Sequence, residues 1–172
     1  MSDTPDAISD RFTTAVRRAF DRDSSLKDVD IASAERIGEE AARVAIANLR
    51  WSVAAGRTLT TSDLIARWGV TRQAIAKRVK SGSIIALPGR LTTHFPAWQF
   101  DGTTGEVRPV VKHILKTFEY YTGHRDSMVI AAWAATPQPE LDNRTPRDWI
   151  EAGADEERLI RLAQATAREL AP

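Results

Sequence analysis

Cysteine is absent from the 172-residue chain, and histidine occurs only three times. The absence of cysteine excludes disulfides, thiolate metal ligands and a cysteine nucleophile, and it fits a reducing compartment. The three histidines, His94, His113 and His124, lack the spacing of metal ligands. The chain also has no HExxH motif, no glycine-rich phosphate loop and no GxSxG elbow. We therefore expect no enzymatic activity, no bound metal and no cofactor.

Long hydrophobic runs are missing as well. No apolar stretch approaches the roughly 18 residues that a membrane span requires, and the first ten residues, MSDTPDAISD, are acidic where a secretory signal would be basic. We expect a cytoplasmic protein without a membrane partner. Apolar residues make up 42% of the chain, which is enough to build a core in one ordinary domain or two small ones.

Acidic side chains are scarce in one segment only. Residues 1–56 carry 8 basic and 10 acidic side chains, and residues 93–172 carry 9 and 12. Residues 57–92 carry 7 basic side chains and a single acid, Asp63, which gives this segment a net charge of +6 between acidic flanks. Such a concentration of charge produces a local positive potential of the kind that binds polyanions.

Two short helices are expected inside the basic segment. The pattern predicts a helix capped by Thr61 or Ser62 that ends at Arg67, a turn at Gly69, and a second helix from a Thr71 cap to about residue 81. Two short helices joined by a glycine turn form the outline of a helix-turn-helix. Apolar residues and glycine occupy the usual positions of that motif, namely Leu64, Trp68, Gly69, Val70 and Ile75.

The motif departs from the usual pattern at Ile65, where many such motifs have alanine, and this predicts a wider helix crossing, as in winged variants. After it, the apolar run IIAL, the turn sequence PGR and the alternating HFPAWQF favour a short β-hairpin, or wing. We expect a winged helix-turn-helix domain over residues 57–105.

This arrangement predicts which side chains would contact DNA. In a helix-turn-helix the second helix enters the major groove, and residues near its N-terminus meet the base edges. The expected base contacts are Thr71, Arg72, Gln73 and Lys77. The expected phosphate contacts are Arg57, Arg78, Lys80 and Arg90. The alternative is a solvated cationic helix in a protein that does not bind DNA.

Amphipathic helices flank this domain on the N-terminal side, over residues 1–56. A short helix is expected to bury Ile8, Phe12, Val16 and Phe20, and a long helix should run from a Ser33 cap to Gly56. The apolar stripe of the long helix would pack either on the domain or on a second copy of the chain. We expect a homodimer, because two copies double the contacts to double-stranded DNA.

The C-terminal part, residues 106–172, is expected to be a helical partner-binding domain, separated from the winged domain near the turn-rich residues 101–106. The fold class is therefore mainly α, with one short β-hairpin. The sequence AAWAATPQPELDNRTPRDWIEAG, residues 131–153, resembles the toxin-binding region of the Xre/MbcA/ParS-like antitoxins. Asn143 stands where that family usually has glycine.

The resemblance implies an N-terminal part that binds operator DNA and a C-terminal part that blocks a RES-domain toxin. It points to partner-binding side chains at Arg144, Arg147, Trp149, Arg158, Arg161 and Arg168. The same part of the chain also has a structural interpretation, in which Leu141, Trp133 and Trp149 hold a helix-loop-helix corner. The sequence thus predicts a nucleoid-associated antitoxin and repressor, or alternatively a DNA-binding regulator or chromosome-organising protein without a toxin.

Overall fold

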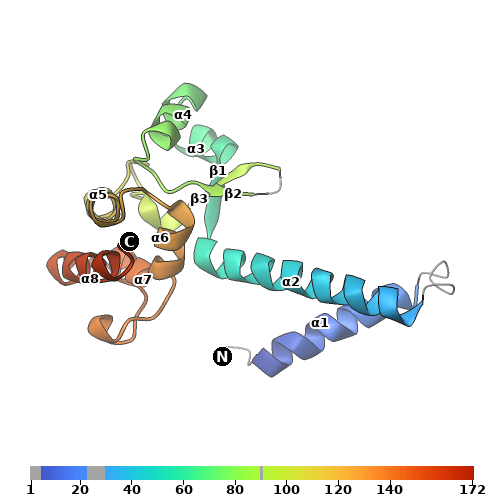
Figure 1. The fold of residues 1–172 in the computed structure, drawn as a ribbon. Coiled ribbons are helices and arrows are strands. Elements are labelled where there is room, and N and C mark those ends of the chain that lie inside the picture. Colours follow the sequence, from blue (N-terminus) through green and yellow to red (C-terminus); the bar gives the residue numbers. More distant parts are fainter. Residues whose placement is uncertain (1–4, 23–29, 90) are drawn as a thin grey trace. The chain divides into compact units, whose positions relative to one another are not determined.

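The computed structural model describes residues 5–22, 30–89 and 91–172 (Figure 1). It divides the chain into two compact units, one ending at Ile46 and the other comprising residues 47–172. Within the described residues, no helix is long and apolar enough to cross a membrane.

The first unit contains helix α1 (Pro5–Phe20) and the first turns of helix α2 (Ile31–Ala55). The Asp30 carboxylate accepts a hydrogen bond of 2.9 Å from the backbone N–H of Ser33. This bond lowers the pKa of Asp30. Asp30 therefore caps α2, and the prediction of a Ser33 cap was wrong by one turn, because a carboxylate three residues earlier satisfies the free N–H group.

The apolar stripe of α1 is present but is not buried. Ile8, Phe12, Val16 and Phe20 follow one another at four-residue intervals, as the sequence predicts, yet their exposed fractions range from 39% to 56%. The expectation that they are buried is therefore wrong for a single chain. The stripe of α2 has the same property, with exposed apolar side chains at Ile37, Val44, Leu49 and Val53.

The second unit begins with a small antiparallel sheet. Its strands are β1 (Thr58–Thr60), β2 (Leu87–Pro88) and β3 (Thr93–Pro96), in the order β1–β3–β2. Helices α3 (Thr61–Trp68) and α4 (Arg72–Lys80) lie in sequence between β1 and β2. Leu59 pairs with Phe95 across the sheet, and both side chains are buried. The expected hairpin is confirmed, whereas β1 was not predicted.

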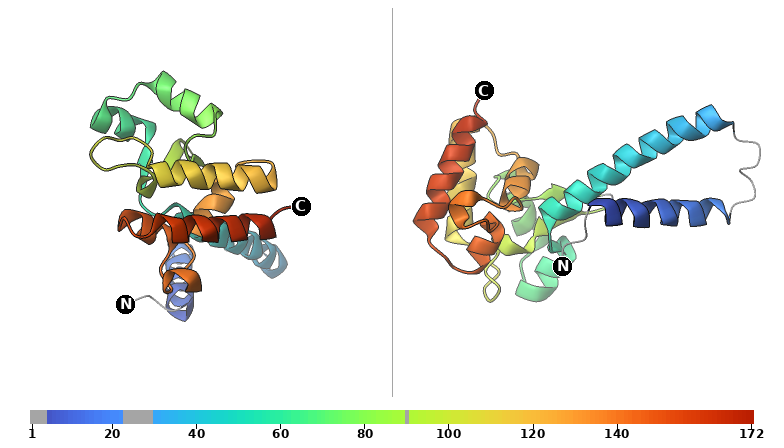
Figure 2. Two further views of the ribbon diagram at one scale, coloured as in Figure 1. Left: turned by 90° about the vertical axis from the view of Figure 1, so that its left-hand side faces the viewer. Right: turned by 90° about the horizontal axis from the view of Figure 1, so that it is seen from below.

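The rest of the second unit is helical, as predicted. It comprises η2 (Ala97–Gln99), α5 (Pro109–Thr122), α6 (Ser127–Ala134), η3 (Pro139–Leu141), α7 (Pro146–Glu151) and α8 (Glu156–Glu169). The long helices α5 and α8 lie side by side (Figure 2). Gly123 ends α5 in a left-handed conformation, and Thr145 caps α7, with Pro146 in its first turn.

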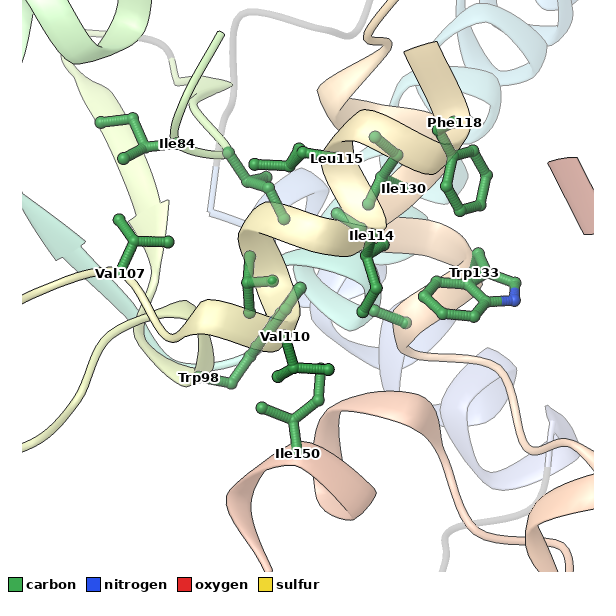
Figure 3. Close-up of a cluster of buried hydrophobic side chains, with 14 of the residues drawn as sticks. Ile84, Trp98, Val107, Val110, Ile114, Leu115, Phe118, Ile130, Trp133 and Ile150 are labelled. Atoms are coloured by element: carbon green, nitrogen blue, oxygen red, sulfur yellow. The ribbon is translucent and has the colours of Figure 1, made fainter. Parts of the chain in front are cut away.

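One continuous core connects the sheet with the helices (Figure 3). Val110 and Ile114 of α5 are buried together with Trp98 of η2 and Trp133 of α6, and Ile84 belongs to the same cluster. Residues 101–106 form a turn inside this unit, so they do not separate two cores as the sequence suggested. The expected winged and helical parts share their buried surface.

The turn between η3 and α7 has an unusual backbone. Asp142 and Asn143 both have φ values of 58°, in the left-handed region that favours glycine or asparagine. Asparagine is one of the few residues other than glycine that adopt this conformation readily. The Asp142 carboxylate accepts a hydrogen bond of 2.9 Å from Arg158, and Thr145 caps α7.

Candidate nucleic-acid interface

A capping box fixes the start of α3. The backbone N–H and the hydroxyl of Thr60 each donate a hydrogen bond of 2.7 Å to the Asp63 carboxylate, and the N–H of Asp63 donates to the Thr60 oxygen at 3.2 Å. Both hydrogen bonds from Thr60 lower the pKa of Asp63, and the bond from the backbone N–H contributes more than the bond from the hydroxyl. The predicted cap at Thr61 or Ser62 is therefore wrong by one or two residues, since Thr60 caps the helix. The one acid of the basic segment has a structural role.

The turn between α3 and α4 follows the prediction closely. Gly69 ends α3 with a φ of 65°, and its N–H donates to the Ile65 carbonyl at 2.9 Å. Thr71 caps α4 by accepting a hydrogen bond of 3.2 Å from the N–H of Ala74. Leu64 and Ile75 are buried, and this fixes the inner side of the two helices. Ile65 is 37% exposed and is therefore not one of the buried residues of the two helices.

Polar and cationic side chains cover the outer face of α4. Arg72, Gln73, Lys77 and Lys80 are all exposed, and none of them forms a hydrogen bond or ion pair through its side chain with the described residues. Val79 is also exposed, and Val70 and Ala74 are only half-buried. The face is therefore available to a ligand with hydrogen-bond acceptors.

Arg78 differs from these residues. Its guanidinium forms an ion pair of 3.0 Å with Glu106, from the turn before α5, and its side chain is 29% exposed. A phosphate contact by Arg78 would have to compete with this carboxylate. The sequence did not show this contact, because the two residues are 28 positions apart.

The C-terminal end of α4 is held by Arg125, from the loop before α6. One terminal nitrogen of its guanidinium donates to the Ser81 and Gly82 carbonyls, at 2.6 Å each. The other terminal nitrogen binds the Glu119 carboxylate. Carbonyls at a helix end have no partner within the helix, so a cation is favourable there.

Gln99 fixes the segment that follows α4. Its fully buried side chain accepts a hydrogen bond of 2.7 Å from the Ile85 N–H and donates one of 2.8 Å to the Ile85 carbonyl. The amide thereby replaces a strand partner for Ile85, which is not part of the sheet. Neither Gln99 nor Arg125 was identified from the sequence, because both act through contacts distant along the chain.

The remaining predicted DNA contacts lie at the sheet. Arg57 is exposed directly before β1, and its carbonyl accepts a hydrogen bond of 2.8 Å from the Ala97 N–H. Arg90 lies outside the described residues. The neighbouring Leu91, between β2 and β3, is 94% exposed.

The predicted partner-binding set is engaged mainly within the chain. Trp149 is only 6% exposed, and its indole N–H donates to the Asp155 carbonyl at 2.9 Å. The guanidiniums of Arg144 and Arg158 lie 5.2 Å and 5.1 Å from the centre of the Trp149 ring. Trp149 is therefore a structural residue and not an accessible anchor, because its indole is covered and hydrogen-bonded.

Three further arginines of that set have other surroundings. Arg147 donates to the carbonyl of Val53 at 2.9 Å, and Arg168 donates to the Tyr121 hydroxyl at 2.9 Å. Arg161 is exposed and lies 3.6 Å from Glu157, one helical turn earlier. Arg161 and Arg168 are exposed, whereas Arg147 is half-buried.

The comparisons with known proteins concern the fold alone. No protein-family model matches the chain, and no curated protein matches it either. Among solved structures, it is similar to the NMR structure of Rv2175c, with a TM-score of 0.55 and 24% sequence identity. The match covers 64% of this chain and 81% of the other. Groups of three or more side chains that could hold a metal ion are absent from the described ranges.

Proposed function

We propose that the protein is a sequence-specific regulator that binds double-stranded DNA through α4. The observation that carries the proposal is the exposed, unpaired set Arg72, Gln73 and Lys77 at the beginning and middle of a helix whose inner side is buried. Arginine can donate two hydrogen bonds to guanine, and glutamine can exchange two with adenine.

The order of the elements supports a winged helix-turn-helix as the interpretation of this region. Strand β1, helices α3 and α4, and the β2–β3 hairpin follow one another within residues 58–96. The net charge of +6 in residues 57–92 adds a contribution to phosphate binding that does not depend on base sequence. In this proposal Lys80 and Arg57 contact phosphates, while Arg78 does so only after leaving Glu106.

The experiment begins by selecting duplexes from a random pool with the full chain, and then compares affinities for a selected and a random duplex. Arg72→Ala and Gln73→Ala should each weaken the selected duplex by about 1–3 kcal/mol and affect the random duplex less. Lys80→Ala should weaken both alike and reduce the salt dependence by about one unit of slope. Arg161→Ala, which removes the same charge from α8, is the control.

Two results would contradict this proposal. One is a selection that enriches no sequence. The other is an equal loss of affinity for selected and random duplexes in the Arg72 and Gln73 variants, since that would place these side chains on phosphates.

We also propose that the chain is a homodimer that associates through α1 and α2. The apolar stripes of these helices carry eight large side chains that are 39–60% exposed, namely Ile8, Phe12, Val16, Phe20, Ile37, Val44, Leu49 and Val53. If each side chain has about 150–200 Å² of surface and about half of it is exposed, the eight present roughly 600–800 Å². This approaches the ~800 Å² that each partner buries in an interface of standard size, so a second copy offering the same stripes could cover it.

Light scattering on the full chain tests the dimer. Phe12→Asp and Phe20→Asp should yield monomers at concentrations where the wild type is a dimer, and helical circular dichroism should fall because isolated helices of this length are marginal. Thr14→Asp, on the opposite side of α1, should remain dimeric. A monomeric wild type, or dimers that survive both phenylalanine substitutions, would contradict the proposal.

The antitoxin function receives less support than DNA binding. Five of its six predicted contact residues form hydrogen bonds, ion pairs or ring contacts within the second unit, namely Arg144, Arg147, Trp149, Arg158 and Arg168. The sixth, Arg161, pairs with Glu157 on its own helix. We therefore propose the regulator without a toxin as the main function. Co-purification of a RES-domain protein with the full chain from its native host would reverse this order.

A further inference from the structure

A cavity of about 140 Å³ in the second unit is lined by three arginines from separate parts of the chain. Arg57 precedes β1, Arg67 lies near the end of α3, and Arg108 precedes α5. The rest of the wall is mostly apolar and includes Trp68 and Trp98. Three arginines therefore line one hollow, and the rest of its wall is mostly apolar.

These cations lack close acidic partners. None of the three guanidiniums lies within 4.0 Å of a carboxylate in the part of the chain that the structure describes. Arg108 donates through its Nε to the Phe100 carbonyl at 3.1 Å, which leaves its terminal nitrogens free of that bond. Arg67 lies 5.3 Å from the ring centre of its neighbour Trp68. An anion in the hollow would be attracted by each of the three positive charges that line it.

Two carboxylates lie near the cavity, and neither removes its positive character. Glu151, the last residue of α7, lines the wall without forming an ion pair with the arginines. Asp101 has a lowered pKa, mainly because the Thr104 N–H and hydroxyl donate to it, and the charge of Arg108 is the smallest contribution. The Asp101 carboxylate thus already accepts hydrogen bonds from residues of its own turn.

We propose that this cavity binds a phosphate-class oxyanion. Its volume corresponds to that of roughly four or five water molecules, since each occupies about 30 Å³, and this suits one tetrahedral group of five heavy atoms. Guanidinium groups donate pairs of hydrogen bonds that match phosphate oxygens, and apolar walls strengthen them by lowering the local dielectric. The phosphate could belong to a free anion or to the backbone of bound DNA; only the second source rests on the proposed function.

The first measurement titrates inorganic phosphate into the full chain at constant ionic strength, with tryptophan fluorescence as the signal because Trp68 and Trp98 line the cavity. Binding should saturate on the order of 1 mM. Arg67→Gln should weaken it at least about tenfold. Glu151→Gln should strengthen it about two- to fivefold, because it removes a repulsive charge. Arg161→Gln, outside the cavity, should have no effect.

A second measurement distinguishes the source of the phosphate. If the cavity holds a backbone phosphate, Arg67→Gln should reduce the salt dependence of duplex binding by about one unit of slope, while Arg161→Gln leaves it unchanged. Saturable binding of free phosphate that depends on Arg67 supports a site for a free anion, whether or not DNA binds. Failure of both measurements, with Arg67→Gln indistinguishable from Arg161→Gln, would overturn the proposal.

Discussion

Replacing Gln99 with leucine tests how the segment after α4 is held. Leucine has a similar volume, so the main change is that the N–H and the carbonyl of Ile85 lose their partners in a fully buried environment. Each buried backbone group left unpaired costs about 1–3 kcal/mol. The added apolar burial offsets about 1 kcal/mol. We expect a net loss of about 2–4 kcal/mol in the free energy of unfolding.

Urea denaturation followed by tryptophan fluorescence measures this loss. For a unit of this size it corresponds to a decrease of about 6–15 °C in Tm. Gln99→Ala should lose more, because it also creates a cavity. Gln164→Leu, at a half-buried position on α8 without a side-chain hydrogen bond in the structure, should change stability by less than about 0.5 kcal/mol. A loss below about 1 kcal/mol for Gln99→Leu would show that Ile85 does not depend on this amide.

Three further outcomes follow from local geometry. Asn143→Gly should preserve or raise stability, whereas Asn143→Val should lower it by about 1–2 kcal/mol, because the φ of 58° disfavours a branched side chain; thermal unfolding of both variants decides this. Hydrogen bonds from Thr60 hold the pKa of Asp63 below its ordinary value of 3.8, so they stabilise the fold above that pH and lose this effect as pH falls through the lowered pKa. The stability advantage of the wild type over Asp63→Asn should therefore disappear in acid titrations, and an advantage that persists there would refute this. Phe118→Ala should lose about 3–5 kcal/mol in urea, since the ring is 2% exposed and packs on Trp133; a loss near zero would contradict the packing.

Features encoded by a few adjacent residues were predicted well. Gly69 ends α3 in a left-handed conformation, and Thr71 caps α4, both as predicted. Such signals are local, because the side chain and the backbone groups it satisfies lie within one turn. The mainly helical class and the short hairpin follow from the same kind of signal.

Features that depend on distant contacts were not predicted. Strand β1 has three residues, which is too short for an alternating pattern, and it forms only because β3 pairs with it. Arg125 and Glu106 contact α4 from positions 28 to 44 residues away, and no local pattern marks such pairs. The apolar stripe of α1 correctly predicted a helix. Periodicity indicates that one face of the helix is apolar, but it does not show which surface packs against that face.

The bond between Arg125 and the end of α4 limits how this protein can be divided. A chimera that transfers residues 57–105 into another scaffold would leave the Ser81 and Gly82 carbonyls without their guanidinium, and it would expose core residues that α5 covers. Substitutions in the helical part can change the orientation of α4 without altering the side chains of its outer face. The smallest part that can be transferred intact is therefore residues 47–172 as a whole. The binding specificity of the α4 surface depends on this entire unit.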